Sequence, residues 1–87
     1  MPPRDSRTRP DLKPAMPGDD VPGGQYREER GTWLVLFGDG SWRSVTVKAW
    51  RVDRHGREVV DLEFWDRSEL TTRTSSFVVD REKLREG

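Results

Sequence analysis

The residues best suited to catalysis are Asp61 and Glu63, two carboxylates that a β-strand would place on one face. Two neighbouring carboxylates can act as a general acid and a general base. We predict Lys48 opposite Asp61 on a neighbouring strand, however, and such a pair is typical of the solvated face of a sheet. His55 lies at the tip of a predicted turn, and the chain has no second histidine and no cysteine to complete a metal site. We therefore predict a protein with no catalytic activity, no metal and no cofactor.

Aromatic side chains offer binding chemistry instead. A predicted aromatic corner consists of Trp33, Phe37, Trp42 and Trp65, with the acidic residue Asp66 beside them. These rings either complete a hydrophobic core or form an exposed recognition surface, and the residues alone leave both interpretations open. Three arginines are interleaved with the rings and can stack on bases or pair with acidic side chains: Arg43, Arg67 and Arg73.

A β-hairpin over residues 32–52 positions most of these residues. Asp39-Gly40 lies between two runs of β-branched and aromatic residues, and this pair tolerates the positive φ angles of a two-residue loop. Such a loop puts Leu34 opposite Val45 on the core face. It also predicts four side chains on the opposite face: Trp33, Val35, Phe37 and Trp42.

Further runs of this kind predict an antiparallel meander, with strands at residues 32–37, 42–52, 57–65 and 70–79. If Val52 pairs with Arg57 across the second turn, one face of the sheet is wholly apolar. That face contains three pairs: Ala49 with Val60, Val47 with Leu62, and Val45 with Phe64. On the other face, the same register pairs Lys48 with Asp61 and Trp50 with Val59.

The two ends of the chain have different predicted structures. All six prolines fall between Pro2 and Pro22, in a segment with few large apolar residues. Because this segment cannot bury enough surface to offset the entropy of ordering, we expect a disordered tail over residues 1–24 and one domain over residues 25–87. An arm that orders on binding is the alternative. Near the C-terminus, Asp80 is a predicted N-cap for one helical turn over residues 81–84.

The order of these elements resembles the Tudor-like members of the SH3-like small barrels. Three segments carry the resemblance: Phe37 to Arg43 with its Asp-Gly-Ser-Trp turn, Val60 to Asp66, and the predicted helical turn. The resemblance implies a small barrel, or a strongly curved meander of four to five strands, over about residues 30–86. It also implies a ligand cage formed by Phe37, Trp42, Trp65 and Asp66. The Phe-Gly-Asp-Gly-Ser-Trp segment is also similar to a segment of short bacterial proteins.

The composition limits the partners that we expect. Charged residues make up 37% of the 87 residues and hydrophobic residues 31%, and the formal net charge is zero. A balanced charge argues against a dedicated binder of nucleic acid or of a membrane surface, since such binders depend on an excess of basic residues. The absence of cysteine and of a long apolar run favours a cytoplasmic protein. We expect a module that binds another protein through the aromatic corner or a sheet edge, as a monomer or weak homodimer. The alternatives are nucleic-acid binding and self-association through an unpaired edge strand.

Overall fold

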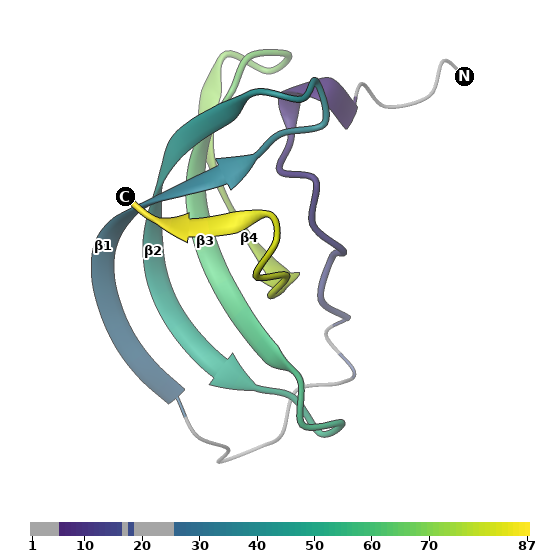
Figure 1. The fold of residues 1–87 in the computed structure, drawn as a ribbon, viewed down its shortest axis with the longest axis vertical. Coiled ribbons are helices and arrows are strands. Elements are labelled where there is room, and N and C mark those ends of the chain that lie inside the picture. The colour runs from purple at the N-terminus through teal and green to yellow at the C-terminus, as the bar shows by residue number, and fades with distance from the viewer. Residues whose placement is uncertain (1–5, 17, 19–25) are drawn as a thin grey trace.

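Five antiparallel strands form one sheet in the computed structural model, which describes residues 6–16, 18 and 26–87 (Figure 1). The strands, in chain order, are β1 Tyr26–Leu36, β2 Trp42–Val52, β3 Glu58–Asp66, β4 Thr71–Val78 and β5 Leu84–Glu86. Their order across the sheet is β4-β3-β2-β1-β5, so the last strand returns to lie beside the first. A short 3₁₀ helix, η1 (Ser6–Thr8), precedes the sheet. The prediction of an all-β antiparallel fold is confirmed.

The sheet is strongly curved, and N-terminal residues cross its open side (Figure 1). Six side chains were predicted for the core face of the second and third strands. All six are buried and five belong to the core cluster, among them Val47, Val60 and Leu62 at 0% exposure; the sixth, Ala49, is not in that cluster. Residues that sequence analysis did not assign to this core join it: Leu12, Val35, Phe37, Trp50, Phe77 and Leu84. The core is therefore larger than predicted, because both ends of the chain contribute to it.

The first hairpin has a three-residue loop, Gly38–Gly40, and not the predicted two-residue loop. The amide of Phe37 donates to the carbonyl oxygen of Ser41 at 2.8 Å, and the amide of Gly40 donates to the carbonyl oxygen of Phe37 at 2.9 Å. Gly40 has a φ of 85°, the left-handed conformation that ends such a loop. The additional residue shifts the register by one, so Leu34 pairs with Ser44 and the predicted pairing with Val45 is wrong.

The second hairpin is built in the same way. Asp53 pairs with Arg57 through a backbone hydrogen bond of 2.9 Å, and Gly56 has a φ of 78°. The register between β2 and β3 also changes near Lys48, where the pairing is irregular. On the N-terminal side of Lys48 in β2, the predicted pair Val47–Leu62 is confirmed.

On the C-terminal side of Lys48 in β2, the predicted pairs are wrong by one residue. Ala49 lies opposite Asp61, and Trp50 lies opposite Val60. A shift of one residue moves a side chain to the other face of a sheet. For this reason Trp50, predicted for the solvated face, is buried in the core at 7% exposure.

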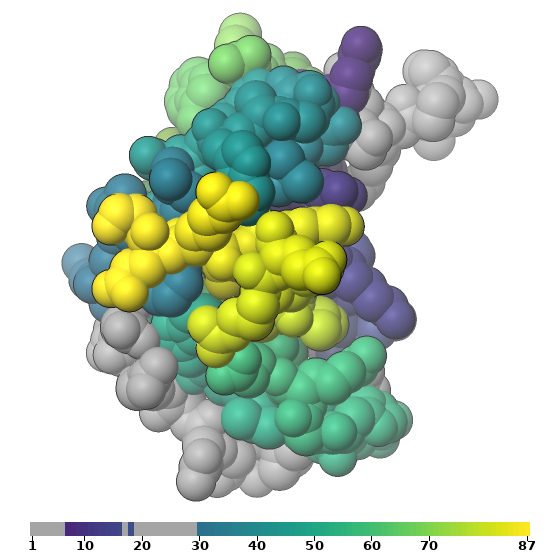
Figure 2. All heavy atoms as spheres, in the orientation of Figure 1, coloured from purple at the N-terminus to yellow at the C-terminus, as the bar shows by residue number. Residues whose placement is uncertain are grey.

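The C-terminal residues form a hydrogen-bonded turn and a strand, and the predicted helical turn is wrong. Asp80 does cap the turn: its side-chain oxygen accepts from the amide of Glu82 at 3.0 Å, and its carbonyl oxygen accepts from the amide of Lys83 at 3.0 Å. The chain then pairs with the free edge of β1, which satisfies backbone groups that a second helical turn would have left to solvent. Leu84 is buried at 3% exposure. In Figure 2 this C-terminal segment (yellow) covers the middle of the visible face.

An N-terminal arm, residues 9–16, lies against the sheet. Four backbone hydrogen bonds attach it, from Asp11 N to Leu36 O (2.8 Å), Gly38 N to Arg9 O (3.0 Å), Ala15 N to Ser76 O (3.0 Å) and Val78 N to Lys13 O (2.8 Å). Leu12 belongs to the core at 7% exposure. This arrangement differs from the expectation of a disordered tail, because one leucine and shared backbone bonds hold the arm in place. Residues 1–5, 17 and 19–25, on which part of that expectation falls, lie outside the described residues.

Candidate functional site

The predicted aromatic corner is divided between the two faces of the sheet. We call the face turned toward the core the inner side, and the opposite face the outer side. Phe37 and Trp33 lie on the inner side with Val35, whereas Trp42 and Trp65 lie on the outer side. The division follows from the alternation of side chains along a strand, combined with the one-residue shift in the first hairpin.

The inner rings pack as core residues. Phe37 is 2% exposed and meets Phe64 edge to face, with ring centroids 6.0 Å apart. Trp33 meets Trp50 at 5.4 Å, also edge to face, and packs against the core cluster. Such pairs add to the free energy gained from burial. Of the two interpretations of these rings, core packing therefore holds for Phe37 and Trp33.

Trp65 is the large exposed ring of the outer side. It is 54% exposed and lies opposite Thr72 of β4. Its neighbours on the same face are polar: Glu63 precedes it by two residues and pairs with Thr46 and Thr74 on the flanking strands. An indole that is half in solvent among polar neighbours gains little free energy from folding. Its exposure therefore needs an explanation other than core packing.

Trp42 lies opposite Leu36 on the same outer side and is half-buried. The guanidinium of Arg85, from β5, lies 4.0 Å from the centroid of its indole ring. Leu34 pairs with both Arg85 and Ser44, so β5, β1 and β2 contribute neighbouring side chains to one row across the sheet. We define the outer-side surface by these residues: Leu34, Trp42, Trp65 and Arg85.

Arg85 was missed by sequence analysis. Its position depends on the pairing of β5 with β1, and no local pattern predicts a three-residue strand at the end of this chain. An arginine close to a tryptophan ring is attracted to the negative face of the ring. Arg85 therefore adds a positive charge to an otherwise apolar part of the outer side.

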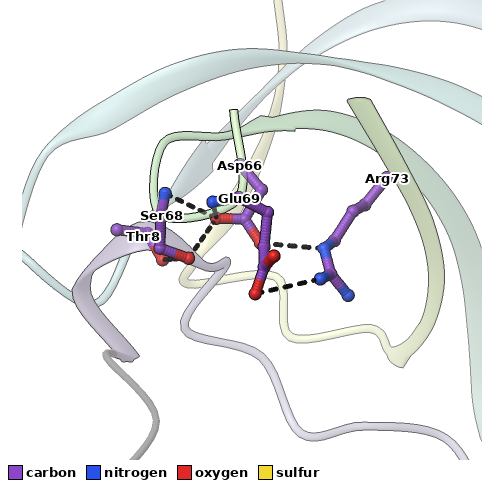
Figure 3. A network of polar contacts seen from close by, with 5 residues as sticks. All are labelled: Thr8, Asp66, Ser68, Glu69 and Arg73. Carbon is purple, nitrogen blue, oxygen red and sulfur yellow. Dashed lines mark hydrogen bonds and ion pairs between the residues drawn. The ribbon is translucent and has the colours of Figure 1, made fainter. Parts of the chain in front are cut away.

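Asp66 does not join the outer-side surface, because it is fully buried on the inner side at the end of β3 (Figure 3). One carboxylate oxygen accepts from the hydroxyl of Ser68 (2.7 Å) and from the amides of Ser68 (2.9 Å) and Glu69 (3.4 Å). The other lies 2.9 Å from Nε of Arg73. The Ser68 hydroxyl above all, then these amides and the Arg73 charge, lower the pKa of Asp66 although burial opposes them. Asp66 thus holds the turn between β3 and β4 together.

The same network extends to η1. Arg73 also lies 3.5 Å from Glu69, and the hydroxyl of Thr8 lies 3.5 Å from that of Ser68 (Figure 3). Of the three predicted basic contacts, Arg73 is thus engaged in the turn. Arg43 pairs with Asp39 at 2.5 Å and lies over the ring of Phe37 at 4.7 Å. Arg67 is exposed in the turn after Asp66.

Asp39 has a lowered pKa for a similar local reason. The hydroxyl and amide of Ser41, together with Arg43, lower it to about 2. Both aspartates therefore order turns, and neither lies beside a group that would use it as an acid or base.

The carboxylates that suggested catalysis are paired with cations. Asp61 lies 2.5 Å from Arg51 and accepts from the hydroxyl of Ser76, and Glu63 lies 3.1 Å from Lys48. The predicted partner of Asp61 was Lys48, and the irregular pairing near that residue explains the exchange. His55 is exposed in its turn. Among the described residues, no three His, Cys, Asp or Glu side chains come together as a metal site requires.

A cleft of about 370 Å³ lies between the arm and the sheet. The arm lines the cleft with residues 9–12 and Pro14. The sheet lines it with residues that include Phe64, Arg73 and Phe77. Sequence analysis did not predict it, since it placed the arm outside the domain.

No family model matches the chain, and no curated protein or solved structure matches it. Within the part of the chain that the structure describes, no helix has the length and apolar character needed to cross a membrane.

Proposed function

We propose that this protein is a non-catalytic binding module that contacts another protein through the outer-side surface. The observation that carries the proposal is the exposure of Trp65, at 54%, among polar neighbours that include Glu63 on its own strand and Thr72 opposite it. Tryptophan and arginine are the side chains that most often dominate protein interfaces. Trp42 and Trp65 supply apolar area from the neighbouring strands β2 and β3, and Arg85 supplies a positive charge beside Trp42.

We further propose an SH3-like barrel as the framework of this module. The strand order supports it, because the short final strand pairs back onto β1 and the sheet is strongly curved. The ligand cage implied by the resemblance to Tudor-like domains is not part of the proposal. Phe37 and Asp66 lie on the inner side and are buried, so they cannot share a ligand with Trp42 and Trp65.

The partner that fits this surface is a protein with an apolar patch bordered by acidic residues. Flat indole rings bury much apolar area at a small entropic cost, and Arg85 pairs favourably with a carboxylate. The zero net charge of the chain favours a protein over a nucleic acid, whose phosphates would attract a basic surface. We also propose a cytoplasmic location, which the lack of cysteine supports.

The test compares Trp65→Ala with Leu70→Ala. Leu70 is the matched control, because it is 74% exposed and lies in the turn that follows Trp65. The full chain and both variants are immobilised and exposed to a lysate of the native host, and captured proteins are identified by mass spectrometry. We expect a protein that the wild type and Leu70→Ala retain and Trp65→Ala loses. Its purified form should then bind the wild type at least about tenfold more tightly than Trp65→Ala.

Three results would contradict the proposal. Identical captured sets would remove Trp65 from recognition. Binding of single-stranded oligonucleotides that weakens steeply with salt would indicate a nucleic-acid partner. A dimer in light scattering that Trp65→Ala dissociates would mean that the surface contacts a second copy of this chain.

A further inference from the structure

The arm is attached to the sheet as an added strand is attached in peptide recognition. Its residues 9 and 11 bond to the end of β1, and its residues 13 and 15 bond to the edge of β4. Pro10 and Pro14 make isolated bridges to Phe37 and Phe77 in these two places. The arm therefore lies between two strands that do not pair with each other, β1 and β4, and we call the surface that it covers there the groove.

The prolines of the arm occupy positions where they cost no hydrogen bond. All four backbone bonds use odd-numbered residues of the arm, and the two prolines are at even-numbered positions 10 and 14. Proline lacks a backbone donor and restricts the chain to extended conformations, so these positions favour the bound shape. Pro10 is itself buried.

One side chain anchors the arm between the prolines. Leu12 is 7% exposed and belongs to the core cluster with Phe37, Phe64 and Phe77. Asp11, which precedes it, lies 3.2 Å from Lys83 of the C-terminal turn. In strand addition, backbone bonds supply affinity and a side-chain pocket supplies specificity. The groove has both features. The segment bound in it, residues 10–14, has the pattern proline, acidic residue, leucine, any residue, proline.

We propose that this groove is a binding site for an extended peptide of another protein with the pattern Pro-Asp-Leu-x-Pro, and that the arm occupies it in the free chain. The arm then acts as an intramolecular competitor, because its tether keeps it at a high effective concentration near the groove. The groove is distinct from the outer-side surface, since Leu12 contacts the inner side of the sheet.

The probe is a synthetic peptide of residues 7–16 that carries a fluorescent label at its N-terminus. Its binding to the full chain and to the full-length variant Leu12→Asp is measured by fluorescence anisotropy. The variant disengages its own arm, because a carboxylate is costly in this apolar pocket. We expect the variant to bind the peptide at least about tenfold more tightly than the wild type, whose arm competes.

Two controls define specificity. A peptide that carries Leu12→Asp should not bind either protein. Trp65→Ala, made in addition to Leu12→Asp, should leave the peptide affinity within about twofold, because the sites are separate. This second control distinguishes failure of the groove from failure of the proposed outer-side surface.

A further measurement covers the case in which Leu12→Asp does not fold. The same peptide, with a nitroxide at its N-terminus, is added in millimolar excess to isotopically labelled wild type. We expect broadened amide signals at Ser68 and Glu69, since Thr8, which directly precedes the arm and is part of the peptide, lies beside Ser68. The proposal is overturned if this broadening is absent, if a folded Leu12→Asp variant does not bind the peptide, or if the control peptide binds equally well.

Discussion

The inner and outer sides of this sheet carry the same kinds of side chain with opposite exposure. On the inner side, Phe37 is 2% exposed and lies against Phe64. On the outer side, Trp65 is 54% exposed although the next residue along β3, Asp66, is fully buried. Aromatic content therefore does not distinguish core from surface in this protein. The position of each residue in the alternation of its strand does.

The two sides also differ in how far their carboxylates are buried. On the inner side, the hydroxyl of Ser68 above all, and then the amides of Ser68 and Glu69 and the charge of Arg73, lower the pKa of Asp66. On the outer side, Asp61 and Glu63 form ion pairs in which both partners are partly exposed. Partly exposed pairs contribute little to stability, whereas removing a partner from a buried carboxylate is costly. We therefore expect substitutions on the inner side to affect folding and those on the outer side to affect binding.

The largest effect should separate the two aromatic populations. Phe37→Ala should lower the free energy of unfolding by about 3 to 5 kcal/mol, because it leaves a cavity beside Phe64. Trp65→Ala should lower it by less than about 1 kcal/mol, since half of the ring is already in solvent. Urea denaturation of both variants measures the difference. Equal losses would show that the division into inner and outer rings has no energetic meaning.

The arm gives the next largest expected effect. Leu12→Ala should cost about 2 to 3 kcal/mol, because Leu12 is buried against inner-side rings. Met16→Ala is the matched control on the same arm, as Met16 is 62% exposed and should cost less than about 0.5 kcal/mol. Thermal unfolding followed by tryptophan fluorescence gives both values. A negligible loss for Leu12→Ala would place the arm outside the cooperative core.

The buried carboxylate of Asp66 should make the free energy of unfolding depend on pH in the acidic range. The pKa of Asp66 is lowered in the folded state, so its contribution is complete above the ordinary aspartate range and is lost as pH falls through the folded value. Asp66→Asn should cost about 2 kcal/mol at pH 7 and progressively less below about pH 4. Urea midpoints measured from pH 7 to pH 2 follow this change. Glu69→Gln, at the exposed end of the same network, is the control and should cost less than about 0.5 kcal/mol at pH 7.

The smallest effect concerns an exposed turn residue. Leu70 has a φ of 52°, a conformation that is costly for a side chain with a β-carbon, and it is 74% exposed. Leu70→Gly should raise the free energy of unfolding by about 0.5 kcal/mol, because relief of this cost exceeds the added entropy of the unfolded chain. Leu70→Ala retains the β-carbon and should give no gain. Differential scanning calorimetry of the pair checks the prediction, and a gain for alanine would contradict it.

Much of the fold follows from local patterns in the chain. The turns predicted at residues 38–41, 53–56 and 66–69 lie within one residue of the observed ones, at residues 38–40, 54–56 and 67–70, and the burial of Val45, Val47 and Leu62 was predicted as well. The lengths of the first two loops were wrong by one residue. In the first, Asp-Gly is compatible with both two- and three-residue loops; in the second, Asp53 pairs with Arg57 and leaves a three-residue loop where four residues were predicted. The single additional residue of the first loop reversed the predicted faces of Leu34 and Val35. The candidate site therefore differs from the predicted one. Phe37 belongs to the core, and Arg85 lies on β5, a strand that no local pattern predicts.

By itself, the sequence determined the class of the fold, the positions of its turns and the apolar residues at its centre. These properties depend on alternation, β-branched side chains, and aspartate or glycine in turns, all of which act over a few neighbouring residues. Only the tertiary structure decided the register, the return of β5 to β1 and the seating of Leu12. Each of these is a contact between segments far apart in the chain. Its free energy comes from pairing and burial that no short stretch of sequence contains, so Trp65 could be separated from Phe37 only in the folded molecule.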